Sequence, residues 1–331
     1  MVMTSTFIES SLCQSDAVFE TPLRPGSLED FVGQKKIIER LQVAMGAALQ
    51  RGEPLGHILF CGPPGLGKTT LSNIISKTMG TNMVVTSGAV LEKPGDLAGI
   101  LTSLKKGDVL FIDEIHRLPR VIEEYLYPAM EDFNLDLVID SGPAARIVQL
   151  KLEQFTLVGA TTRAGALTAP LRSRFGLTCR LDYYHADDLK HVVQRSGELL
   201  NIDIDDISAL EVAKRSRGTP RIANNLLRWV RDYAQMRNDS LVDLEVVDRS
   251  LEMLSIDNLG LDEVDKKILT LIVDFHDGGP VGLGTIAAAI GEETVTIEDM
   301  YEPYLIMKGF LRRTPRGREV TPLAYEHLQK K

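Results

Sequence analysis

Cysteine is scarce in this chain of 331 residues. Only three occur, Cys13, Cys61 and Cys179, and they lie far apart. There is no CxxC pair and no Cys/His spacing of the kind that binds zinc, so the sequence predicts neither a disulfide framework nor a structural zinc site. Cysteines used this sparingly are typical of reduced thiols in a cytosolic protein.

Long apolar runs and positive charge are also in short supply. No uncharged stretch approaches the roughly 18 apolar residues of a membrane-spanning helix, and the first ten residues, MVMTSTFIES, lack the basic region of a signal peptide. The 37 Lys and Arg residues against 46 Asp and Glu leave a net charge of −9. We therefore expect a soluble cytoplasmic protein in which any nucleic-acid contact comes from a local basic patch.

The patterning of apolar residues, which with Ala and Cys make up 44% of the chain, predicts three domains. From residue 84 to residue 159, short apolar runs alternate with helical patterns, which indicates an α/β fold with a parallel sheet covered on both faces. Apolar residues then recur at helical spacing, and three helices followed by a hairpin end the chain in the order of a winged helix. The predicted domains are a large α/β domain (1–184), a small helical domain (185–255) and a winged-helix domain (256–331).

Two local signals bear on helix boundaries. Ser27, followed by the acidic Glu29 and Asp30, indicates a helix start, and the helical pattern behind it ends at Gly52. In the winged-helix domain the third helix contains Pro303, where we expect a kink.

The strongest motif is GPPGLGKT (62–69), which fits G-x-x-x-x-G-K-[ST] in full. It follows the apolar run HILFC and opens a helical pattern, which is the strand–loop–helix context that a phosphate loop requires. Its glycines let backbone N–H groups surround phosphates, and the helix N-terminus adds a favourable dipole. Lys68 is placed to reach the β- and γ-phosphates of ATP, and the Thr69 hydroxyl to ligate Mg²⁺.

A second strand, in DVLFIDEIH (108–116), ends in two carboxylates. Asp113 is placed to hold Mg²⁺ and Glu114 to polarise the attacking water. Alone, the two acids would fit the start of a helix equally well, but beside a phosphate loop the catalytic interpretation is favoured. His116 is better interpreted as a structural or relay residue than as a ligand.

Hydroxyls and arginines complete the pattern. The strand FTLVGATTR (155–163) ends in Thr161 and Thr162, either of which is a candidate for contacting the γ-phosphate or the water. LRSRFG (171–176) carries two arginines, and a guanidinium near a γ-phosphate stabilises phosphoryl transfer, often from a neighbouring subunit. Arg221 begins a helix of the second domain, where it would link the domain angle to the nucleotide state.

These motifs, in this order, resemble the AAA+ ATPases. Within that family the resemblance is greatest to the Holliday-junction branch-migration motors, through segments such as DVLFIDEIHRL, LVGATTRAG, RGTPRIAN and GFLRRTPRGR, and it runs from about Thr21 to Leu323. It implies an ATP-driven motor that moves duplex DNA through four-way junctions in recombination and repair. It also implies a homohexameric ring that acts with RuvA, the junction-recognising protein, and with the resolvase RuvC.

The resemblance also implies residue roles. Arg174, rather than Arg172, is the finger that reaches a neighbour's nucleotide, and Arg221 is the second sensor. Leu23 and Arg24 flank the base, Tyr184 lies where the two ATPase domains join, and Glu131–Phe133 lie near an adjoining protomer's nucleotide. The implied catalytic residues are Lys68, Asp113, Glu114 and Arg174. The implied nucleotide-binding residues are Leu23, Arg24, Gly65, Gly67, Lys68, Thr69, Thr70, Glu131, Asp132, Phe133, Thr161, Arg174, Tyr184 and Arg221.

Apolar residues alternate on both sides of Gly142-Pro143 in the segment of about 134–155, which predicts a β-hairpin. A hairpin that projects from its domain exposes part of its apolar face and makes a docking surface. The resemblance implies that it binds RuvA, and we expect Val148 and Leu150 to make the contact. The alternative is a hairpin packed on its own domain.

The segment KGFLRRTPRGR (308–318) has five basic residues and no acid. A basic hairpin beside a helix-turn-helix suits phosphate contacts that do not depend on base sequence. We expect Arg313 and Arg318 to contact DNA with support from Arg312 and Arg316, and a solvated loop is the alternative. Thr294 stands where we expect relatives often to carry an arginine, so either this chain has one fewer DNA contact or that contact is not essential.

Two other functions fit the ATPase motifs. A protein remodeller would thread polypeptide with an aromatic pore loop, and none is convincing between Leu91 and Leu104. A nucleotide-switched DNA-binding regulator or clamp-loader subunit would read base edges with its winged helix. Neither explains the hairpin and the basic wing together.

Overall fold

The computed structural model describes residues 7–8, 11, 17–139, 146–237 and 241–329. They form two compact units. The first, Arg24–Asp182, is called here the P-loop unit, and the second consists of Tyr183–Lys331 with the described residues among the first 23.

The P-loop unit is built on a five-stranded parallel sheet with the order β2-β3-β6-β1-β7. Its strands are β1 (Ile58–Cys61), β2 (Met83–Ser87), β3 (Val109–Asp113), β6 (Thr156–Thr161) and β7 (Leu177–Arg180). The inner strands β1 and β6 are buried along their whole length, as parallel strands covered on both faces must be. The predicted parallel sheet is therefore confirmed, with β7 added at one edge.

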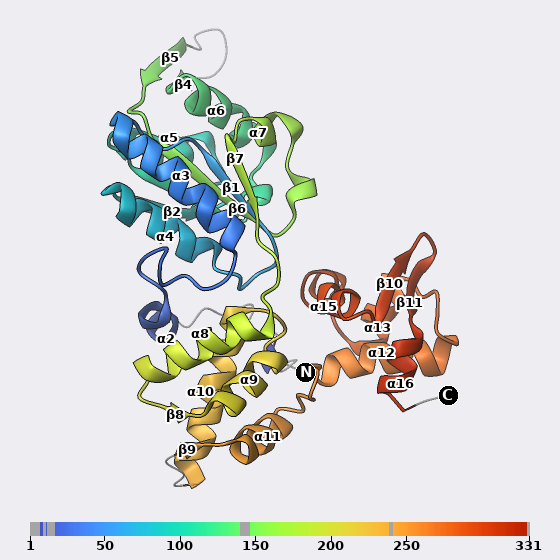
Figure 1. Ribbon diagram of the computed structural model, residues 1–331. Helices are drawn as coiled ribbons and strands as arrows, with labels where there is room; N and C mark the ends of the chain where they lie inside the picture. Colours follow the sequence, from blue (N-terminus) through green and yellow to red (C-terminus); the bar gives the residue numbers. More distant parts are fainter. Residues whose placement is uncertain (1–6, 9–10, 12–16, 140–145, 238–240, 330–331) are drawn as a thin grey trace. The chain divides into compact units, whose positions relative to one another are not determined.

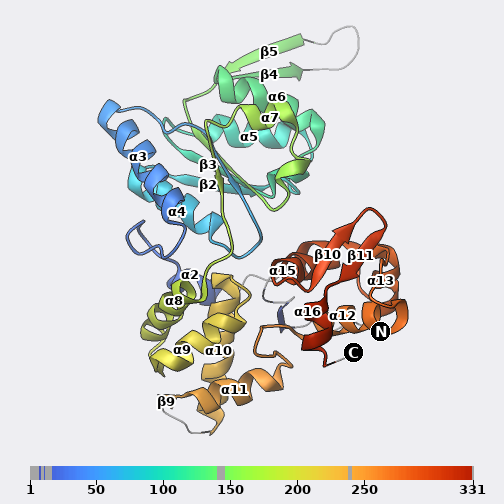
Figure 2. The ribbon, with the colours of Figure 1, turned by 45° about the vertical axis from the view of Figure 1, so that its right-hand side comes forward.

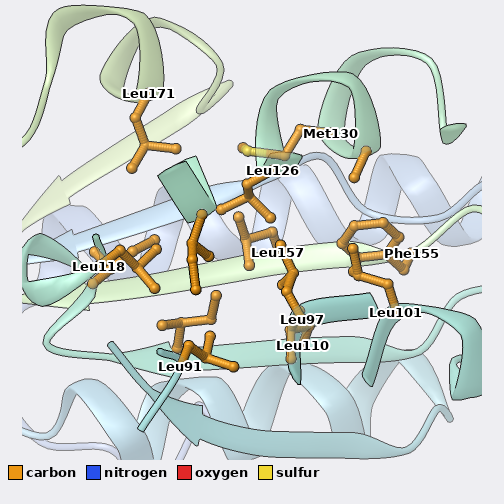
Figure 3. Packing of buried hydrophobic residues seen from close by; sticks show 14 of the residues in the cluster. Leu91, Leu97, Leu101, Leu110, Leu118, Leu126, Met130, Phe155, Leu157 and Leu171 are labelled. Carbon is orange, nitrogen blue, oxygen red and sulfur yellow. The ribbon is translucent and has the colours of Figure 1, made fainter. Parts of the chain in front are cut away.

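Helices cover both faces of this sheet (Figure 1). One face carries α3 (Lys35–Arg51) and α4 (Lys68–Met79), and the other α5 (Pro94–Ser103), α6 (Arg120–Glu131) and α7 (Ala169–Ser173). In the core under α5 and α6, Leu97 and Leu126 pack against Leu110 and Leu157 of the strands (Figure 3). Strand alternation turns the neighbours of Leu110 toward α4 on the opposite face.

The first helix begins later than its sequence signal indicates. Residues 26–30 form bends, in which the Ser27 hydroxyl donates to Asp30, and α3 starts only at Lys35. The prediction of a helix start at Ser27 is therefore wrong. The predicted end is right, because Gly52 closes α3 in the left-handed region at φ 66°.

The predicted hairpin is present as β4 (Asn134–Ile139) paired antiparallel with β5 (Arg146–Lys151). Leu135 lies opposite Leu150, and Leu137 opposite Val148. The Gly142-Pro143 turn lies outside the described residues.

The second unit contains the predicted helical domain and winged helix (Figure 2). Its helical part consists of α2 (Ala17–Leu23), α8 (Ala186–Leu199), β8 (Asp203–Ile204), α9 (Asp206–Arg215), α10 (Pro220–Arg237), β9 (Leu241–Val242) and α11 (Leu244–Met253). Its winged helix consists of α12 (Glu263–His276), α13 (Leu283–Ile290), α14 (Thr294–Thr296), the π-helical turn η3 (Ile297–Tyr301), α15 (Glu302–Met307), the wing strands β10 (Leu311–Thr314) and β11 (Gly317–Val320), and α16 (Pro322–His327). The irregularity expected at Pro303 appears as that π-helical turn just before it. No helix in the described ranges is long and apolar enough to span a membrane.

Candidate active site

The phosphate loop leaves the end of β1 and enters α4. Gly62, Gly65 and Gly67 take φ values of 145°, 78° and 97°, which side chains rarely allow. A Cβ on Gly62 would lie 2.5 Å from the carbonyl oxygen of Leu181, so this position has no room for one. The ammonium of the buried Lys68 donates to the carbonyls of Gly62 at 2.7 Å and Pro63 at 2.8 Å. The lysine is therefore held against the loop that would surround the phosphates.

Asp113 is the last residue of β3 and Glu114 follows it, so both carboxylates lie at the edge formed by the carboxyl ends of the strands, where the phosphate loop also begins (called here the nucleotide edge). Asp113 accepts a hydrogen bond from the backbone N–H of Glu114 at 3.0 Å, and Glu114 itself takes a left-handed φ of 45°. One oxygen of Glu114, Oε2, accepts from the Thr162 hydroxyl at 3.0 Å and lies 3.0 Å from Nδ1 of His116. Both partners hold the Glu114 carboxylate in a fixed orientation.

These contacts set the charge of Glu114. Burial of the side chain favours the neutral acid, but hydrogen bonds from His116 and Thr162 outweigh it and lower the pKa of Glu114. The carboxylate is therefore ionised at neutral pH, as a group that polarises a water molecule must be.

Among the hydroxyls, Thr162 contacts Glu114 directly, and Thr161 does so through His116. Thr161 is fully buried, and its Oγ1 lies 2.9 Å from Nδ1 of His116. The Nδ1 atom of His116 thus lies between the Glu114 carboxylate and the Thr161 hydroxyl at the end of β6, an arrangement that suits a structural role. The sequence left Thr161 and Thr162 open, and the geometry favours Thr162 as the partner of the carboxylate.

Gly88, directly after β2, belongs to the site although the sequence did not single it out. Its N–H donates to the carbonyl of Asp113 at 2.8 Å, and a Cβ at this position would lie 2.5 Å from the carbonyl oxygen of Glu114. Only glycine lets β2 end so close to the Glu114 turn. A glycine at the end of a strand was the only signal.

The donors for a metal ion are hard oxygens. Thr69 lies in the first turn of α4, and Asp113 ends β3. No group of three or more His, Cys, Asp or Glu side chains able to hold a metal was found in the described ranges. A hydroxyl and one carboxylate fit Mg²⁺, which takes few protein ligands and completes its shell with phosphates and water.

Lys68 lies at the carboxyl ends of the strands, and Arg174 lies at the opposite edge of the sheet, which is formed by their amino ends. It stands just before β7, whose first residue, Leu177, pairs with Ile58, the first residue of β1, whereas the phosphate loop follows the last residue of β1. A strand of four residues separates the two edges by roughly 13 Å. Arg174 therefore does not share an edge with the phosphate loop of its own unit.

Arg174 is held there by α6. Its Nη2 lies 3.1 Å from Oε2 of Glu131, and its guanidinium stacks 4.4 Å above the ring of Tyr127. Asp132, which follows Glu131 in the chain, is exposed, while Phe133 is half-buried against Phe155. The structure thus gathers Arg174 and Glu131–Phe133 into one surface, and Arg172 is exposed nearby in sequence.

Three of the proposed nucleotide contacts belong to the second unit. Arg221 pairs with Glu20 at 3.1 Å, and Tyr184 is buried with its N–H donating to Gly218. The carbonyl of the buried Leu23 accepts from Arg195 at 2.8 Å. Arg24 is the first residue of the P-loop unit.

The hairpin is apolar on one face, and along that face burial decreases from Leu152 to Val148, with distance from the core of its domain. Leu152 is buried, Leu150 is half-buried against the core under α6, and Val148 is exposed. Of the two residues expected to contact a partner, Val148 is accessible to one, whereas part of the Leu150 side chain packs against its own domain.

The wing arginines have acidic partners within the chain. Arg313 and Arg318 both bind Glu302, a fully buried carboxylate at the start of α15, at 2.5 Å and 3.0 Å. Arg312 pairs with Glu319 at 2.8 Å. Arg316 is exposed in the turn and has no acidic partner within the described residues. Glu302 had no sequence signal as part of this cluster.

Family models of three domains match the chain in succession. They are the Holliday junction DNA helicase RuvB P-loop domain (residues 23–181), the RuvB AAA lid domain (184–257) and the RuvB C-terminal winged helix domain (258–329). The chain belongs to the RuvB family.

Individual RuvB proteins agree with this assignment. The chain is 64% identical, over 98% of both lengths, to the Holliday junction branch migration complex subunit RuvB of Protochlamydia amoebophila (strain UWE25). The solved RuvB Holliday junction branch migration motor of Thermotoga maritima is 50% identical with a TM-score of 0.86, over 94% of this chain and 99% of that one. A mutant of the same Thermotoga protein aligns with a TM-score of 0.87 over 93% of this chain.

The RuvB assignment confirms the predicted fold class and the predicted activity. The chain is an AAA+ P-loop ATPase of the branch-migration type, with a nucleotide-binding domain, a lid and a winged helix. It favours the DNA motor over the protein remodeller and the DNA-binding regulator, the two alternatives that the sequence left open.

Proposed function

We propose that this chain works as a homohexameric ring on duplex DNA, in which Arg174 of each subunit completes the nucleotide site of its neighbour. The ring drives branch migration of Holliday junctions in recombination and repair, in the cytoplasm, together with RuvA and RuvC. The observation that carries the proposal is the separation of Lys68 and Arg174 at opposite edges of one sheet. A guanidinium fixed at the far edge serves phosphoryl transfer only in another copy of the chain.

Within one subunit, the edge at the end of β1, β3 and β6 performs the chemistry. Lys68 binds the β- and γ-phosphates, and Glu114 orients and polarises the attacking water while Thr162 and His116 hold its carboxylate. Thr69 and Asp113 hold Mg²⁺, which neutralises charge on the phosphates when bound. Gly65, Gly67 and Thr70 surround the phosphates at the start of α4.

The remaining nucleotide contacts come from the base side and from the next subunit. Leu23, Arg24 and Tyr184 contact the base and the join between large domain and lid, and Glu131, Asp132 and Phe133 face the neighbour's nucleotide. Arg221 exchanges Glu20 for the nucleotide phosphates, which changes the lid angle. The domains are 1–184, 185–255 and 256–331.

Two surfaces connect the ring to its partners. Val148 and Leu150 on the hairpin bind RuvA, supported by the exposure of Val148. Arg312, Arg313, Arg316 and Arg318 on the wing contact DNA phosphates, and Arg316 is exposed with no acidic partner among the described residues. The contacts do not read base sequence.

The test is ATP-driven dissociation of a synthetic four-way DNA junction, with and without RuvA. Dissociation should require ATP, Lys68 and RuvA, so Lys68→Ala should reduce it to background. Lys77→Ala is the matched control, because Lys77 is an exposed lysine in the last turn of the same helix. ATP hydrolysis without any junction movement would overturn the proposal.

A further inference from the structure

The second unit contains a buried charge that the nucleotide chemistry does not use. Arg217 lies in the turn between α9 and α10, at a left-handed φ of 53°, and only 2% of it is exposed. Its Nη1 lies 3.1 Å from Oδ2 of Asp265, and its Nη2 donates to Oδ1 of the same residue at 3.3 Å. Asp265 is fully buried in the first turn of α12, so an arginine of the lid is paired with an acid of the winged helix.

The same guanidinium contacts two further elements of the winged helix. It stacks 4.4 Å above the ring of Tyr304 in α15, and its Nη2 donates to the carbonyl of Met300 in η3 at 3.4 Å. Tyr304 in turn donates to the carbonyl of Leu259, in the segment that joins the lid to α12, at 2.5 Å. One side chain of the lid thus touches three elements of the winged helix.

The connecting segment is fixed at the same place. Gly260 has a φ of 77°, and a Cβ there would lie 2.7 Å from the carbonyl oxygen of Arg215, at the end of α9. Asp262 then caps α12 by accepting from the N–H groups of Val264 and Asp265, each at 2.9 Å. The chain therefore passes from lid to winged helix in close contact with the turn that carries Arg217.

The pair depends on both members. Burial raises the pKa of Asp265 to about 7, although the charge of Arg217 lowers it. Removing Arg217 alone would raise the pKa of Asp265 further, so the buried acid would have to take up a proton or remain as an unfavourable unpaired charge.

The turn that carries Arg217 leads directly into α10, whose second residue is the candidate sensor, Arg221. We propose that Arg217 is a positioning residue that locks the lid to the winged helix, so that both move as one lever when the nucleotide state changes. The lever transmits lid rotation to the DNA-binding wing. This role rests on the motor function proposed above, because it gives that motor its mechanical output.

The first test separates hydrolysis from movement. Arg217→Met should leave the ATPase rate within about twofold and lower junction dissociation at least about tenfold, so that more ATP is hydrolysed for each junction dissociated. A merely structural role would lower both activities together and leave this ratio unchanged, which would overturn the proposal. The double variant Arg217→Met with Asp265→Leu removes both charges and keeps the test valid where the single variant folds poorly.

Arg215→Met is the matched control. Arg215 is a similarly buried arginine two residues earlier, but its partners Glu211 and Asp248 both belong to the lid. Its loss should leave the ratio of ATP hydrolysed to junctions dissociated unchanged. A ratio that rises as much in Arg215→Met as in Arg217→Met would contradict a specific role of Arg217.

The second test does not depend on motor activity. Spin labels at Met236→Cys on α10 and Phe275→Cys on α12, both highly exposed, report the distance between lid and winged helix. Cys13→Ser is added so that the remaining native cysteines, Cys61 and Cys179, are both buried. The distance distribution should be narrow and the same with and without ATP, and it should broaden in the Arg217 variants. A broad distribution with Arg217 present, or an unchanged one without it, would refute the lock, whereas failure of the motor itself would appear in the junction assay alone.

Discussion

The charged side chains at the nucleotide edge of the P-loop unit are held by different kinds of partner from those in the wing. At the nucleotide edge, Lys68 is held by backbone carbonyls and Glu114 by a hydroxyl and an imidazole. In the wing, Arg313 and Arg318 are held by a buried carboxylate, Glu302. An incoming phosphate therefore meets an ammonium held by carbonyl oxygens in the first region, and competes with the full negative charge of Glu302 in the second.

The difference shows how one chain suits two kinds of phosphate. The nucleotide edge is prepared to capture a phosphate and to hold it for reaction, which favours charges that are fixed in position. A DNA surface that moves must release each phosphate again, and arginines already paired within the chain bind phosphates more weakly than free ones would. In the proposed function the wing therefore makes repeated, salt-dependent contacts with DNA rather than a tight complex.

The largest effect is expected from removing the base at the nucleotide edge. Glu114→Gln keeps the shape and the contact with Thr162 but loses the negative charge, so ATP hydrolysis should fall by roughly 10²–10⁴-fold while ATP binding is retained. Single-turnover hydrolysis and nucleotide titration measure the two quantities. Hydrolysis at the normal rate would refute the role assigned to Glu114.

A smaller but substantial effect is expected in the wing, on stability instead of activity. Arg318→Ala removes one of two partners of the buried Glu302, so the free energy of unfolding of the second unit should fall by about 1–3 kcal/mol. Thermal and urea unfolding measure this. Arg312→Ala, at an exposed pair with Glu319, is the control and should change stability by less than about 1 kcal/mol.

The third prediction concerns pH. Because hydrogen bonds lower the pKa of Glu114, its carboxylate stays ionised as the pH falls, and the ATPase rate should vary little with this group between about pH 5 and pH 8. His116→Ala removes the strongest of these hydrogen bonds, so the pKa of Glu114 should rise and activity should begin to fall at a higher pH. If the ATPase rate of His116→Ala falls at the same acidic pH as that of the unchanged protein, His116 does not lower the pKa of Glu114.

The smallest effect is expected at Arg316, the wing arginine for which the described residues supply no acidic partner. Arg316→Ala should weaken duplex binding a few-fold for all sequences alike and lower the slope of log K against log salt by about 1. Fold stability should not change, in contrast to Arg318→Ala. Equal losses of affinity from Arg316→Ala and Arg318→Ala, at unchanged stability, would abolish the distinction between free and paired arginines in the wing.

Features encoded locally could be predicted from the sequence, and features set by distant contacts could not. The phosphate loop, Asp113 and Glu114 lie at the ends of buried strands. Each motif together with its strand therefore predicted a position at the carboxyl end of the sheet. The partnership of Glu302 with Arg313 and Arg318 bridges 11 and 16 residues and depends on how α15 packs beside the wing. No local sequence pattern predicts that Glu302 pairs with these two arginines.

The errors at element boundaries have the same cause. Ser27 makes a local hydrogen bond with Asp30 that resembles a helix cap, but α3 begins after Gln34, whose side chain donates to the carbonyl of Asp182 at 2.6 Å. A tertiary contact 148 residues away accompanies the true start. Strand β7 is short and only partly buried at the sheet edge, so its four residues carry no alternation to detect.

The central claim, that Arg174 completes a neighbour's site, is tested most directly by mixing two inactive variants. Lys68→Ala subunits lose the phosphate contact but keep the finger, and Arg174→Ala subunits lose the finger but keep the phosphate contact. If the finger acts between subunits, mixed rings contain sites with both residues intact, and the ATPase rate should recover well above that of either variant alone. Rings that assemble from both subunits and show no recovery at any mixing ratio would contradict the claim.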